Sequence, residues 1–500
     1  MARRKKKKIL LSPVMMMIIM ILSVCVLSSI LSILSVDASQ TSIVNNNLET
    51  SLVVIRNIFS KEGLINFFTS IFNNFSLLKP LSLIIISLLT VSVGKSSGLF
   101  KHLFMPLKKL KPFVLTFIVV FLGVLSTVIG DYSYIVLIPF VAVMYEYLNK
   151  SPMLGVITIF LGITLGYGAG LFVNYNDYAL GILTETAAVI DVDATYEYSL
   201  YSSFYIMITS SILLTFLLTY LIDKYIGRKI QVIEHYEDEL VTSKKALSFS
   251  LIGFVVSLIP IVLMILPNGV LLDTTQEHYI AQLFSSNSGF YASFIYLTLI
   301  IISIVSYIYG KVSGNFQNHH DFSFGLTKEF EKNGYLFLML FLSSILIGII
   351  DWTNIGVVFA IKLLDLISLL DLSGIPLIIV SFIAIILMSI FIPGSIEKWA
   401  LISPIIVPVF MRGNLTPDFA QFLFEMADGI GKVLTPAFIY FILLIGFIQK
   451  YNIKENKLTL LNTMKLVWPI IIIVSIVWLL LLILWYISGL PLGVGTLTTM

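Results

Sequence analysis

The sequence predicts an all-α polytopic membrane protein, and two observations support this fold class. Hydrophobic residues make up 58% of the 500 residues and charged residues only 12%, whereas soluble domains carry about 25% charged residues. Runs of roughly 20 apolar residues, long enough to cross a bilayer core, recur along nearly the whole chain. Because lipid offers no hydrogen-bond partners to the backbone, these runs are expected to be helices.

The N-terminal region begins with a basic run, Arg3 to Lys8, followed by an apolar stretch to about Val36. Positive charge beside a first membrane segment predicts a cytoplasmic N-terminus. We favour a retained anchor because the apolar run exceeds the roughly 7–15 residues of a signal-peptide core. A cleavable signal peptide remains the alternative, since Val36-Asp37-Ala38 offers small residues. A polar stretch, Asp37–Glu49, comes next, and the amphipathic region that follows it to about Lys79 predicts an interfacial helix.

The remaining apolar segments alternate with connections of contrasting charge. They lie at about 81–93, 113–129, 132–147, 152–173, 179–190, 200–222, 247–266, 289–310, 334–350, 353–370, 375–392, 399–411, 417–433, 435–448 and 466–488. Lysine-rich connections at 95–111, 223–245, 311–333 and 450–465 all fall on one predicted side, the cytoplasm. The loop 267–289 contains no lysine or arginine and is predicted to be external.

Several classes of chemistry are unlikely on composition. The single cysteine, Cys25, excludes an intrachain disulfide and a thiolate metal cluster. The five histidines lack the spacing of a zinc hydrolase, and the chain has no phosphate-cradling loop. No soluble domain follows the basic run, which argues against nucleic-acid binding. These observations favour a transporter without a cofactor, driven by Na⁺ or H⁺, over an enzyme.

Two apolar segments, 132–147 and 399–411, are too short or too interrupted to cross a membrane alone. Each contains proline and a following methionine, Pro139 and Met144 in the first, Pro404, Pro408 and Met411 in the second. Short interrupted segments at corresponding positions of two halves indicate a transporter's binding site. The sequence therefore predicts two related halves that meet at such a site.

Polar residues interrupt the first half at two places. Asp131 follows Gly130 where a span breaks, and it is either the N-cap of the next short helix or a cation ligand. Three glycines at 166, 168 and 170 precede Asn174, Asn176 and Asp177, whose oxygens suit Na⁺. An ordinary external loop is the alternative for this second stretch.

The second half carries two further polar clusters. In Pro393–Trp399, a polar turn starts a new helix, and Glu397, Lys398 and Trp399 are either functional or simply interfacial. Glu425, Asp428 and Lys432 share one helix face at i, i+3 and i+7. An ionised side chain at mid-bilayer costs at least ~2.5–3.5 kcal/mol, so this set predicts a function, although a structural Asp428–Lys432 pair is the alternative. Glu425 is left to take up a proton or cation.

At these places the sequence resembles the p-aminobenzoyl-glutamate transporter (AbgT) family, over about residues 80–455. The matching stretches are Asp131-x-x-Tyr134-x-Val-Leu-Ile-Pro139, Asp177-x-x-Leu-Gly-Ile182-x-Thr184-Glu185, Lys398-Trp399-Ala-Leu-x-x-Pro404-Ile-x-Val-Pro408 and Asp428-Gly429 with Thr435-Pro436. The resemblance implies a bowl-shaped homodimer, inverted structural repeats with two re-entrant hairpins, and ion-driven movement of p-aminobenzoyl-glutamate or, in some members, export of sulfonamide antimetabolites.

By position, the resemblance implies functional roles for Asp177, Asp428, Trp399 and the helix-breaking Pro436. The sequence departs from the family pattern at Ile396, Glu425 and Gly170, where a serine, an arginine and an asparagine are expected. Lys432 is the nearby cation that could replace that arginine. We therefore predict substrate binding by Asp177, Trp399, Asp428, Lys432 and Pro436, and coupling-ion binding by Asp131, Asn174, Asn176 and Glu425.

The predicted organisation follows from the spans and the resemblance. It comprises a basic tail, first transmembrane helix and interfacial helix (1–79), a first repeat with a re-entrant hairpin (80–223), a cytoplasmic loop (224–245), connecting helices and a loop (246–332), a second repeat with a re-entrant hairpin (333–455) and a C-terminal transmembrane helix (456–500). The expected location is the bacterial inner membrane. A dicarboxylate or amino-acid carrier is the alternative function, and a membrane glycan polymerase is disfavoured because the loop 267–289 lacks basic residues.

Overall fold

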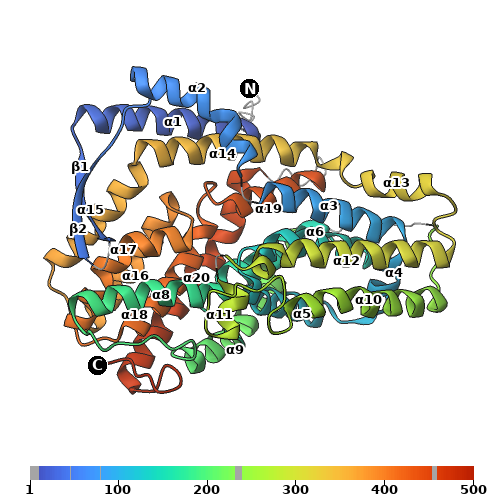
Figure 1. Cartoon of the computed structure of the whole chain (residues 1–500). Coiled ribbons are helices and arrows are strands. Elements are labelled where there is room, and N and C mark those ends of the chain that lie inside the picture. Colours follow the sequence, from blue (N-terminus) through green and yellow to red (C-terminus); the bar gives the residue numbers. More distant parts are fainter. Residues whose placement is uncertain (1–10, 45–46, 79, 231–238, 286, 453–458) are drawn as a thin grey trace, which may run out of the picture.

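The computed structural model describes residues 11–44, 47–78, 80–230, 239–285, 287–452 and 459–500. It confirms a helical membrane protein (Figure 1). Among these residues, nine helical stretches are long and apolar enough to cross a membrane. The basic run at residues 3–8 lies outside the described residues, so its cytoplasmic placement stays a prediction. Inverted repeats and re-entrant hairpins likewise remain expectations.

The N-terminal region forms a helix, a β-hairpin and a second helix. These are α1 (Pro13–Ile33), β1 (Asp37–Val44), β2 (Asn47–Val54) and α2 (Lys61–Ser76). The strands pair antiparallel, with Asp37 opposite Val54 and Val44 opposite Asn47. Sequence reasoning gave this polar stretch no regular structure, although its serine, threonine and β-branched residues suit a strand pair. Helix α2 lies within the predicted amphipathic region and exposes Phe68 and Phe72.

The first predicted half folds into helices α3 to α9, most of them at the predicted positions. Their bounds are α3 (Leu81–Ser96), α4 (Leu99–Phe104), η1 (Met105–Lys109), α5 (Pro112–Leu125), η2 (Ser126–Ile129), α6 (Tyr132–Tyr147), α7 (Pro152–Leu165), α8 (Tyr175–Asp191) and α9 (Phe204–Leu221), followed by η3 (Ile222–Ile226). Helix α6 has the bounds expected for the short segment 132–147. Proline at the first turn fixes the start of α5 and of α7.

The middle of the chain supplies α10 (Lys244–Ile265), α11 (Tyr279–Phe284), α12 (Gly289–Ser313), α13 (His319–Thr327) and η4 (Glu331–Asn333). The second half contains α14 (Gly334–Thr353), α15 (Ile355–Leu369), α16 (Gly374–Phe391), α17 (Ser395–Arg412), α18 (Pro417–Val433), α19 (Ile439–Lys450) and α20 (Leu460–Ser488). Helix α17 contains Pro404 and Pro408 in its interior. It packs against α8 and α18, so elements of the two halves meet there.

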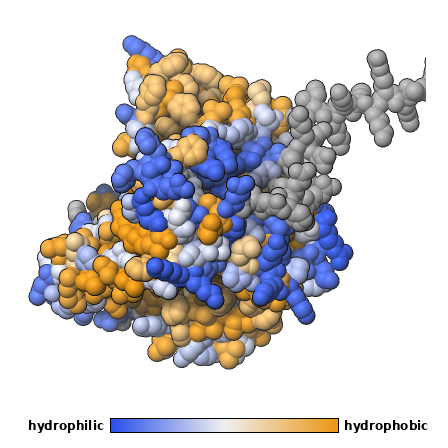
Figure 2. All heavy atoms as spheres, turned by 90° about the vertical axis from the view of Figure 1, so that its right-hand side faces the viewer, coloured by the Kyte–Doolittle hydropathy of each residue, from blue (hydrophilic) through white to orange (hydrophobic). Residues whose placement is uncertain are grey.

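The described parts of three predicted cytoplasmic connections, 95–111, 239–245 and 311–333, lie together at one end of the molecule, where α4, α10, α12 and α13 approach one another (Figure 1). Lys101 Nζ donates to the carbonyl of Leu240 at 2.9 Å, and Asn315 Nδ2 donates to the carbonyls of Ser97 and Val241 at 2.8 and 3.0 Å. Figure 2 views the molecule from this end and shows hydrophilic residues across the middle of the face, with hydrophobic residues above and below. This grouping agrees with the charge pattern, while the orientation in the membrane remains a prediction.

Candidate functional site

Helix α18 lies at the centre of the candidate site, and all 17 of its residues are buried. Thr416 caps the helix by accepting from the amide of Phe419, and Pro417 occupies the first turn. Polar side chains recur along it every three or four residues, at Asp418, Gln421, Glu425, Asp428 and Lys432. This spacing puts them on one helix face. A stripe of charge inside a completely buried helix requires partners from neighbouring helices.

Close packing of α18 against α16 brings those partners within reach. A Cβ atom added at Gly431 would lie 2.4 Å from Ser389 Cβ and 2.6 Å from the carbonyl oxygen of Ile386. A Cβ atom at Gly429 would lie 2.4 Å from the carbonyl oxygen of Thr164 in α7. The two glycines therefore allow backbones to approach on either side of Asp428, as small residues do in membrane helix packing.

The carboxylate of Asp428 has no exposed surface and collects contacts from three helices. Ser389 of α16 donates to its Oδ1 at 2.9 Å, and Ser395 of α17 donates to its Oδ2 at 2.5 Å. Lys398 of α17 forms an ion pair with Oδ1, and Lys432 lies 3.3 Å from Oδ2. Asp428 therefore joins α16, α17 and α18 through charge-assisted hydrogen bonds.

Lys398 is the clearest correction to the sequence interpretation, which left open an interfacial position. Its side chain is fully buried, and its ammonium donates to Ser389 Oγ at 2.7 Å and to the carbonyl of Ile392 at 2.8 Å, besides pairing with Asp428. The interfacial alternative is therefore wrong for Lys398. Glu397, one residue earlier, is exposed, and its interfacial position stays a prediction.

Lys432 forms the predicted i, i+4 pair with Asp428, but its surroundings differ from those of Lys398. Its Nζ atom donates to Ser395 Oγ at 2.5 Å. The same ammonium lies 4.0 Å from the ring centroid of Tyr167 and 5.3 Å from that of Phe438. Oxygen atoms therefore satisfy one side of Lys432, while aromatic rings face another side.

A hydrogen-bonded chain links Trp399 of α17 to Glu425 of α18 by way of Thr184 in α8. Trp399 donates through Nε1 to Thr184 of α8 at 3.0 Å, and Thr184 donates to Gln421 Oε1 at 2.6 Å. Gln421 then donates to Glu425 Oε1 at 3.1 Å and to Tyr198 at 3.2 Å. The Trp399 ring packs 4.6 Å from that of Phe424. Trp399, predicted to bind substrate, and Glu425, predicted to bind the coupling ion, are thus joined by one continuous polar network.

Asp177 and Asn174 form a capping box at the start of α8. The Asp177 amide donates to Asn174 Oδ1 at 3.0 Å, and the Asn174 amide donates to Asp177 Oδ2 at 3.3 Å. The carbonyl of Asp177 lies 3.5 Å from Gln421 Nε2, which places it beside the network. Asn174 and Asp177 therefore have a structural task in addition to any role in ion or substrate binding.

The other predicted residues lie around this core. A Cβ atom at Gly130, whose φ of +57° favours glycine, would lie 3.4 Å from Asn176 Nδ2, so Asn176 faces the turn just before Asp131. The carboxylate of Asp131 lies at the start of α6. Pro436 is buried in the break between α18 and α19, where it lines an apolar cavity of about 310 Å³ that also involves α1 and α14. It therefore lies apart from the hydrogen bonds of Asp428.

A separate cavity of about 340 Å³ lies between β1, α14, α15, the end of α16 and the start of α17. Its lining includes Asp351, Ile392 and Glu397. Ile392 is also the residue whose carbonyl accepts from Lys398. The cavity therefore reaches a residue that contacts the buried ionic cluster directly.

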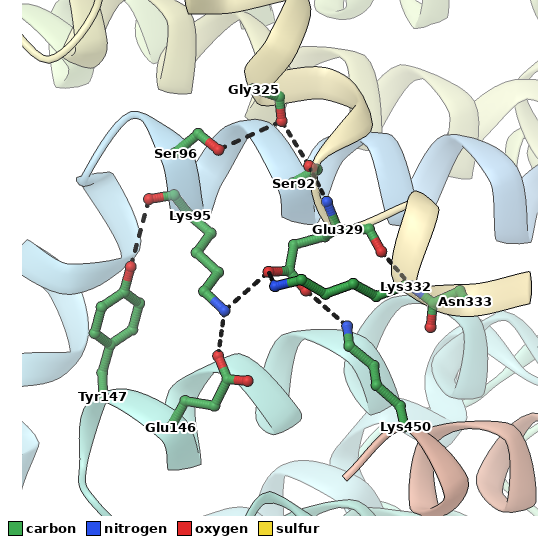
Figure 3. Close-up of polar contacts among 10 residues, drawn as sticks. All are labelled: Ser92, Lys95, Ser96, Glu146, Tyr147, Gly325, Glu329, Lys332, Asn333 and Lys450. Atoms are coloured by element: carbon green, nitrogen blue, oxygen red, sulfur yellow. Dashed lines mark hydrogen bonds and ion pairs between the residues drawn. The ribbon is translucent and has the colours of Figure 1, made fainter. Parts of the chain in front are cut away.

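A second buried ionic cluster lies where the ends of α3, α6 and α19 meet the segment between α13 and η4 (Figure 3). Lys95 of α3 pairs with Glu146 of α6 at 2.5 Å and with Glu329 at 3.0 Å, while Lys450 of α19 pairs with Glu329 at 2.7 Å. Lys332, half exposed, lies 3.2 Å from the same carboxylate. Sequence reasoning counted these lysines only as loop charges and did not single out either glutamate.

Some site residues carried signals that the sequence reading did not use. Extending the spacing of Glu425, Asp428 and Lys432 toward the N-terminus reaches Gln421 and Asp418. Thr184 lies in one of the stretches that resemble the AbgT family, but no role was predicted for it. Ser389 and Ser395 had no such signal, because single serines are common in membrane helices and their role depends on how the helices pack.

Comparisons with known proteins identify the family of the chain. The model of the AbgT putative transporter family matches residues 5–500. The p-aminobenzoyl-glutamate transport protein of Escherichia coli (strain K12) is 29% identical over 488 residues, covering 95% of this chain and 92% of that protein. The crystal structure of the Alcanivorax borkumensis YdaH transporter matches with a TM-score of 0.50 and 22% identity, covering 97% of this chain and all of that one. Neisseria gonorrhoeae MtrF matches with a TM-score of 0.49 and 24% identity, over 98% of each chain. The chain belongs to the AbgT putative transporter family.

Proposed function

We propose that this AbgT-family membrane transporter is an ion-coupled secondary transporter of p-aminobenzoyl-glutamate or of sulfonamide-like aromatic substrates. The observation that carries the proposal is the environment of Lys432, a buried cation with oxygen atoms on one side and the Tyr167 and Phe438 rings on another. An aromatic carboxylate matches this combination, because its charge suits the ammonium and its ring suits the aromatic side chains. The Escherichia coli relative, named for p-aminobenzoyl-glutamate, supports the same substrate class.

The position of Trp399 supports an aromatic substrate as well. Its indole packs against Phe424 and is oriented by the hydrogen bond to Thr184. Lys432 takes the place of the arginine that the family pattern has at position 425, where this chain carries Glu425. A lysine offers a point charge instead of a planar fork, so we expect looser geometric selection of the carboxylate.

Glu425 also keeps a second candidate open, a dicarboxylate or amino-acid carrier. A carboxylate at this position would repel an anionic substrate while ionised and would attract an amino group. Gln421 holds Glu425 beside the same network that contacts Trp399. Competition between unlabelled glutamate, succinate and p-aminobenzoyl-glutamate for one labelled substrate separates the two candidates.

The test is uptake into proteoliposomes that contain the purified full-length chain. Labelled p-aminobenzoyl-glutamate and a labelled sulfonamide are supplied under imposed pH and Na⁺ gradients, with protein-free liposomes as the control. Gradient-dependent accumulation of either substrate supports the proposal. Absence of movement by protein that remains monodisperse contradicts the proposed substrate class.

The assembly and location are part of the same proposal. We expect a homodimer in the bacterial inner membrane, with the lysine-rich end in the cytoplasm. Mass measurement of the detergent complex tests the dimer. Labelling of single cysteines placed in the loops 267–289 and 311–333 from either side of intact cells tests the orientation.

A further inference from the structure

The ammonium of Lys398 lies where the end of α16, the start of α17 and the middle of α18 converge. Three oxygen atoms surround it, from the carboxylate of Asp428, the hydroxyl of Ser389 and the main-chain carbonyl of Ile392. An ammonium has three N–H donors, so the three oxygens match its full capacity. We call Asp428, Ser389 and Ile392 the oxygen cage.

The composition of the oxygen cage is that of an alkali-cation site. Hard cations in proteins bind carboxylate, hydroxyl and carbonyl oxygens, and transporters present such carbonyls where a helix is interrupted. Helix α16 ends at Phe391 and Pro393 follows, so the carbonyl of Ile392 lies beyond the helix and is directed to Lys398. The cation in the cage belongs to the protein itself.

Lys432 provides a contrast on the other side of Asp428. Lys398 is surrounded by oxygens, whereas Lys432 has aromatic rings on one side and so has room in its coordination for a substrate oxygen. Asp428 balances only one positive charge. If Lys398 loses a proton, Asp428 and Lys432 remain as a balanced buried pair, which avoids leaving an unpaired charge in a medium of low dielectric.

We propose that the Lys398 ammonium is a tethered replacement for an alkali cation in the oxygen cage, and that the cage exchanges a proton at Lys398 instead of binding Na⁺. In release, the ammonium gives one proton to water and becomes a neutral amine. In uptake, the amine takes one proton from water. The cavity lined by Asp351, Ile392 and Glu397 reaches a residue of the cage, because Ile392 belongs to both, and it offers a route for the water that exchanges this proton.

The charged and titratable groups that face Lys398 set the conditions for this exchange. Asp428 and Lys432 face it from α18, Glu397 precedes it on α17, and Tyr167 lies against Lys432 from the segment after α7. The negative charge of Asp428 favours the protonated form of Lys398, and the positive charge of Lys432 disfavours it. A substrate carboxylate that binds Lys432 removes this opposition, so substrate binding and protonation of Lys398 favour each other. The inference rests on the proposed transport function in this coupling step alone.

The first experiment measures binding of ²²Na⁺ to the purified full-length protein by equilibrium dialysis, with K⁺ as the competing background ion. Lys398→Ala empties the oxygen cage, and Lys332→Ala removes a half-exposed lysine of η4 as a matched control. We expect saturable binding of one Na⁺ per chain by Lys398→Ala only, and its loss in the double variant Lys398→Ala/Asp428→Asn. Saturable binding by the wild-type protein, or none by a monodisperse Lys398→Ala variant, overturns the inference.

The second experiment needs no cavity-creating variant. In proteoliposomes, we expect a pH gradient to drive uptake by the wild-type protein and a Na⁺ gradient alone to drive none. Lys398→Arg keeps a cation in the cage that does not release its proton. It should lower gradient-driven uptake by at least about 100-fold while substrate binding is retained. Uptake driven by Na⁺ alone, or full activity of Lys398→Arg, refutes the inference. If neither gradient moves any substrate, the proposed function fails, while the ²²Na⁺ comparison still decides the nature of the cage.

Discussion

Replacement of Glu329 by glutamine tests how much the ionic cluster of Figure 3 contributes to stability. The Glu329 carboxylate is buried and contacts Lys450 at 2.7 Å, Lys95 at 3.0 Å and Lys332 at 3.2 Å. Glutamine keeps the shape of the side chain but removes the negative charge. Lys95 retains Glu146, whereas Lys450 loses its carboxylate partner.

The expected cost follows from the burial of the two lysines. Removing one member of a buried ion pair destabilises by about 3–5 kcal/mol, because an uncompensated charge stays in the interior. Lys332, whose side chain is 53% exposed, loses an ion pair of about 0–1 kcal/mol when it is changed to methionine. The unfolding equilibrium should therefore move more than about 100-fold for Glu329→Gln and much less for Lys332→Met.

The assay is reversible unfolding in mixed micelles, followed by tryptophan fluorescence at increasing denaturing detergent. Adding Lys450→Met to Glu329→Gln removes the unpaired charge, so the double variant should be more stable than the sum of the single changes by about 0.5–3 kcal/mol. Equal costs for Glu329→Gln and Lys332→Met, or additive costs in the double variant, would refute the assignment of a buried, coupled cluster.

Four further changes test the site and the loops. Asp428→Asn should abolish gradient-driven uptake in proteoliposomes loaded with equal amounts of monodisperse protein, and unchanged uptake would contradict its central role. Gly431→Ala should destabilise by about 1–3 kcal/mol, because its Cβ would meet Ser389 at 2.4 Å, whereas Gly334→Ala, with no atom within 4 Å of the added Cβ, should leave the melting temperature unchanged. Trp399→Phe keeps the ring contact with Phe424 but loses the donor to Thr184, so the substrate KM should rise by roughly 3–10-fold, consistent with one lost hydrogen bond. Hydrogen bonds from Ser285 and Thr275 hold the pKa of Asp273 below its ordinary value, so they stabilise the segment 273–285 at neutral pH. This stabilisation is lost as the pH falls through the lowered pKa, and limited proteolysis of Ser285→Ala at neutral and acid pH measures it.

The helices were predictable from the sequence because a single apolar segment in a membrane satisfies its backbone hydrogen bonds only as a helix. The short segment 132–147 forms a helix with those bounds, and 417–433 forms α18. The β-hairpin was missed because its strands are rich in polar residues and neither shows an alternation of buried and exposed positions: β1 is mostly half-buried and β2 mostly exposed.

The residues of the candidate site were predictable only where they place a charge on an apolar helix. Glu425, Asp428 and Lys432 were found because an ionised side chain in an apolar segment is costly and conspicuous. Lys398 was ambiguous, since its position beside Pro393 and Gly394 suits either a membrane surface or a buried helix end. Ser389 and Ser395 could not be found from sequence, because their contacts with Asp428 exist only once α16, α17 and α18 have packed.

The two interior prolines of α17 make the C-terminal part of this helix easier to bend than its N-terminal part. Pro404 and Pro408 have no N–H, so the carbonyls of Ala400 and Pro404 do not receive the usual bond from four residues ahead. The first two turns carry Lys398 and Trp399, whose side chains are held by Asp428 and Thr184. The following turns lack two of their backbone hydrogen bonds. The free-energy cost of bending α17 is therefore lowest at Pro404 and Pro408, just beyond the ionic cluster. The C-terminal part of α17 can therefore change its angle to the N-terminal part. Such a movement would alter the cavity lined by Pro404, Pro408 and Arg412 while Lys398 keeps its contact with α18.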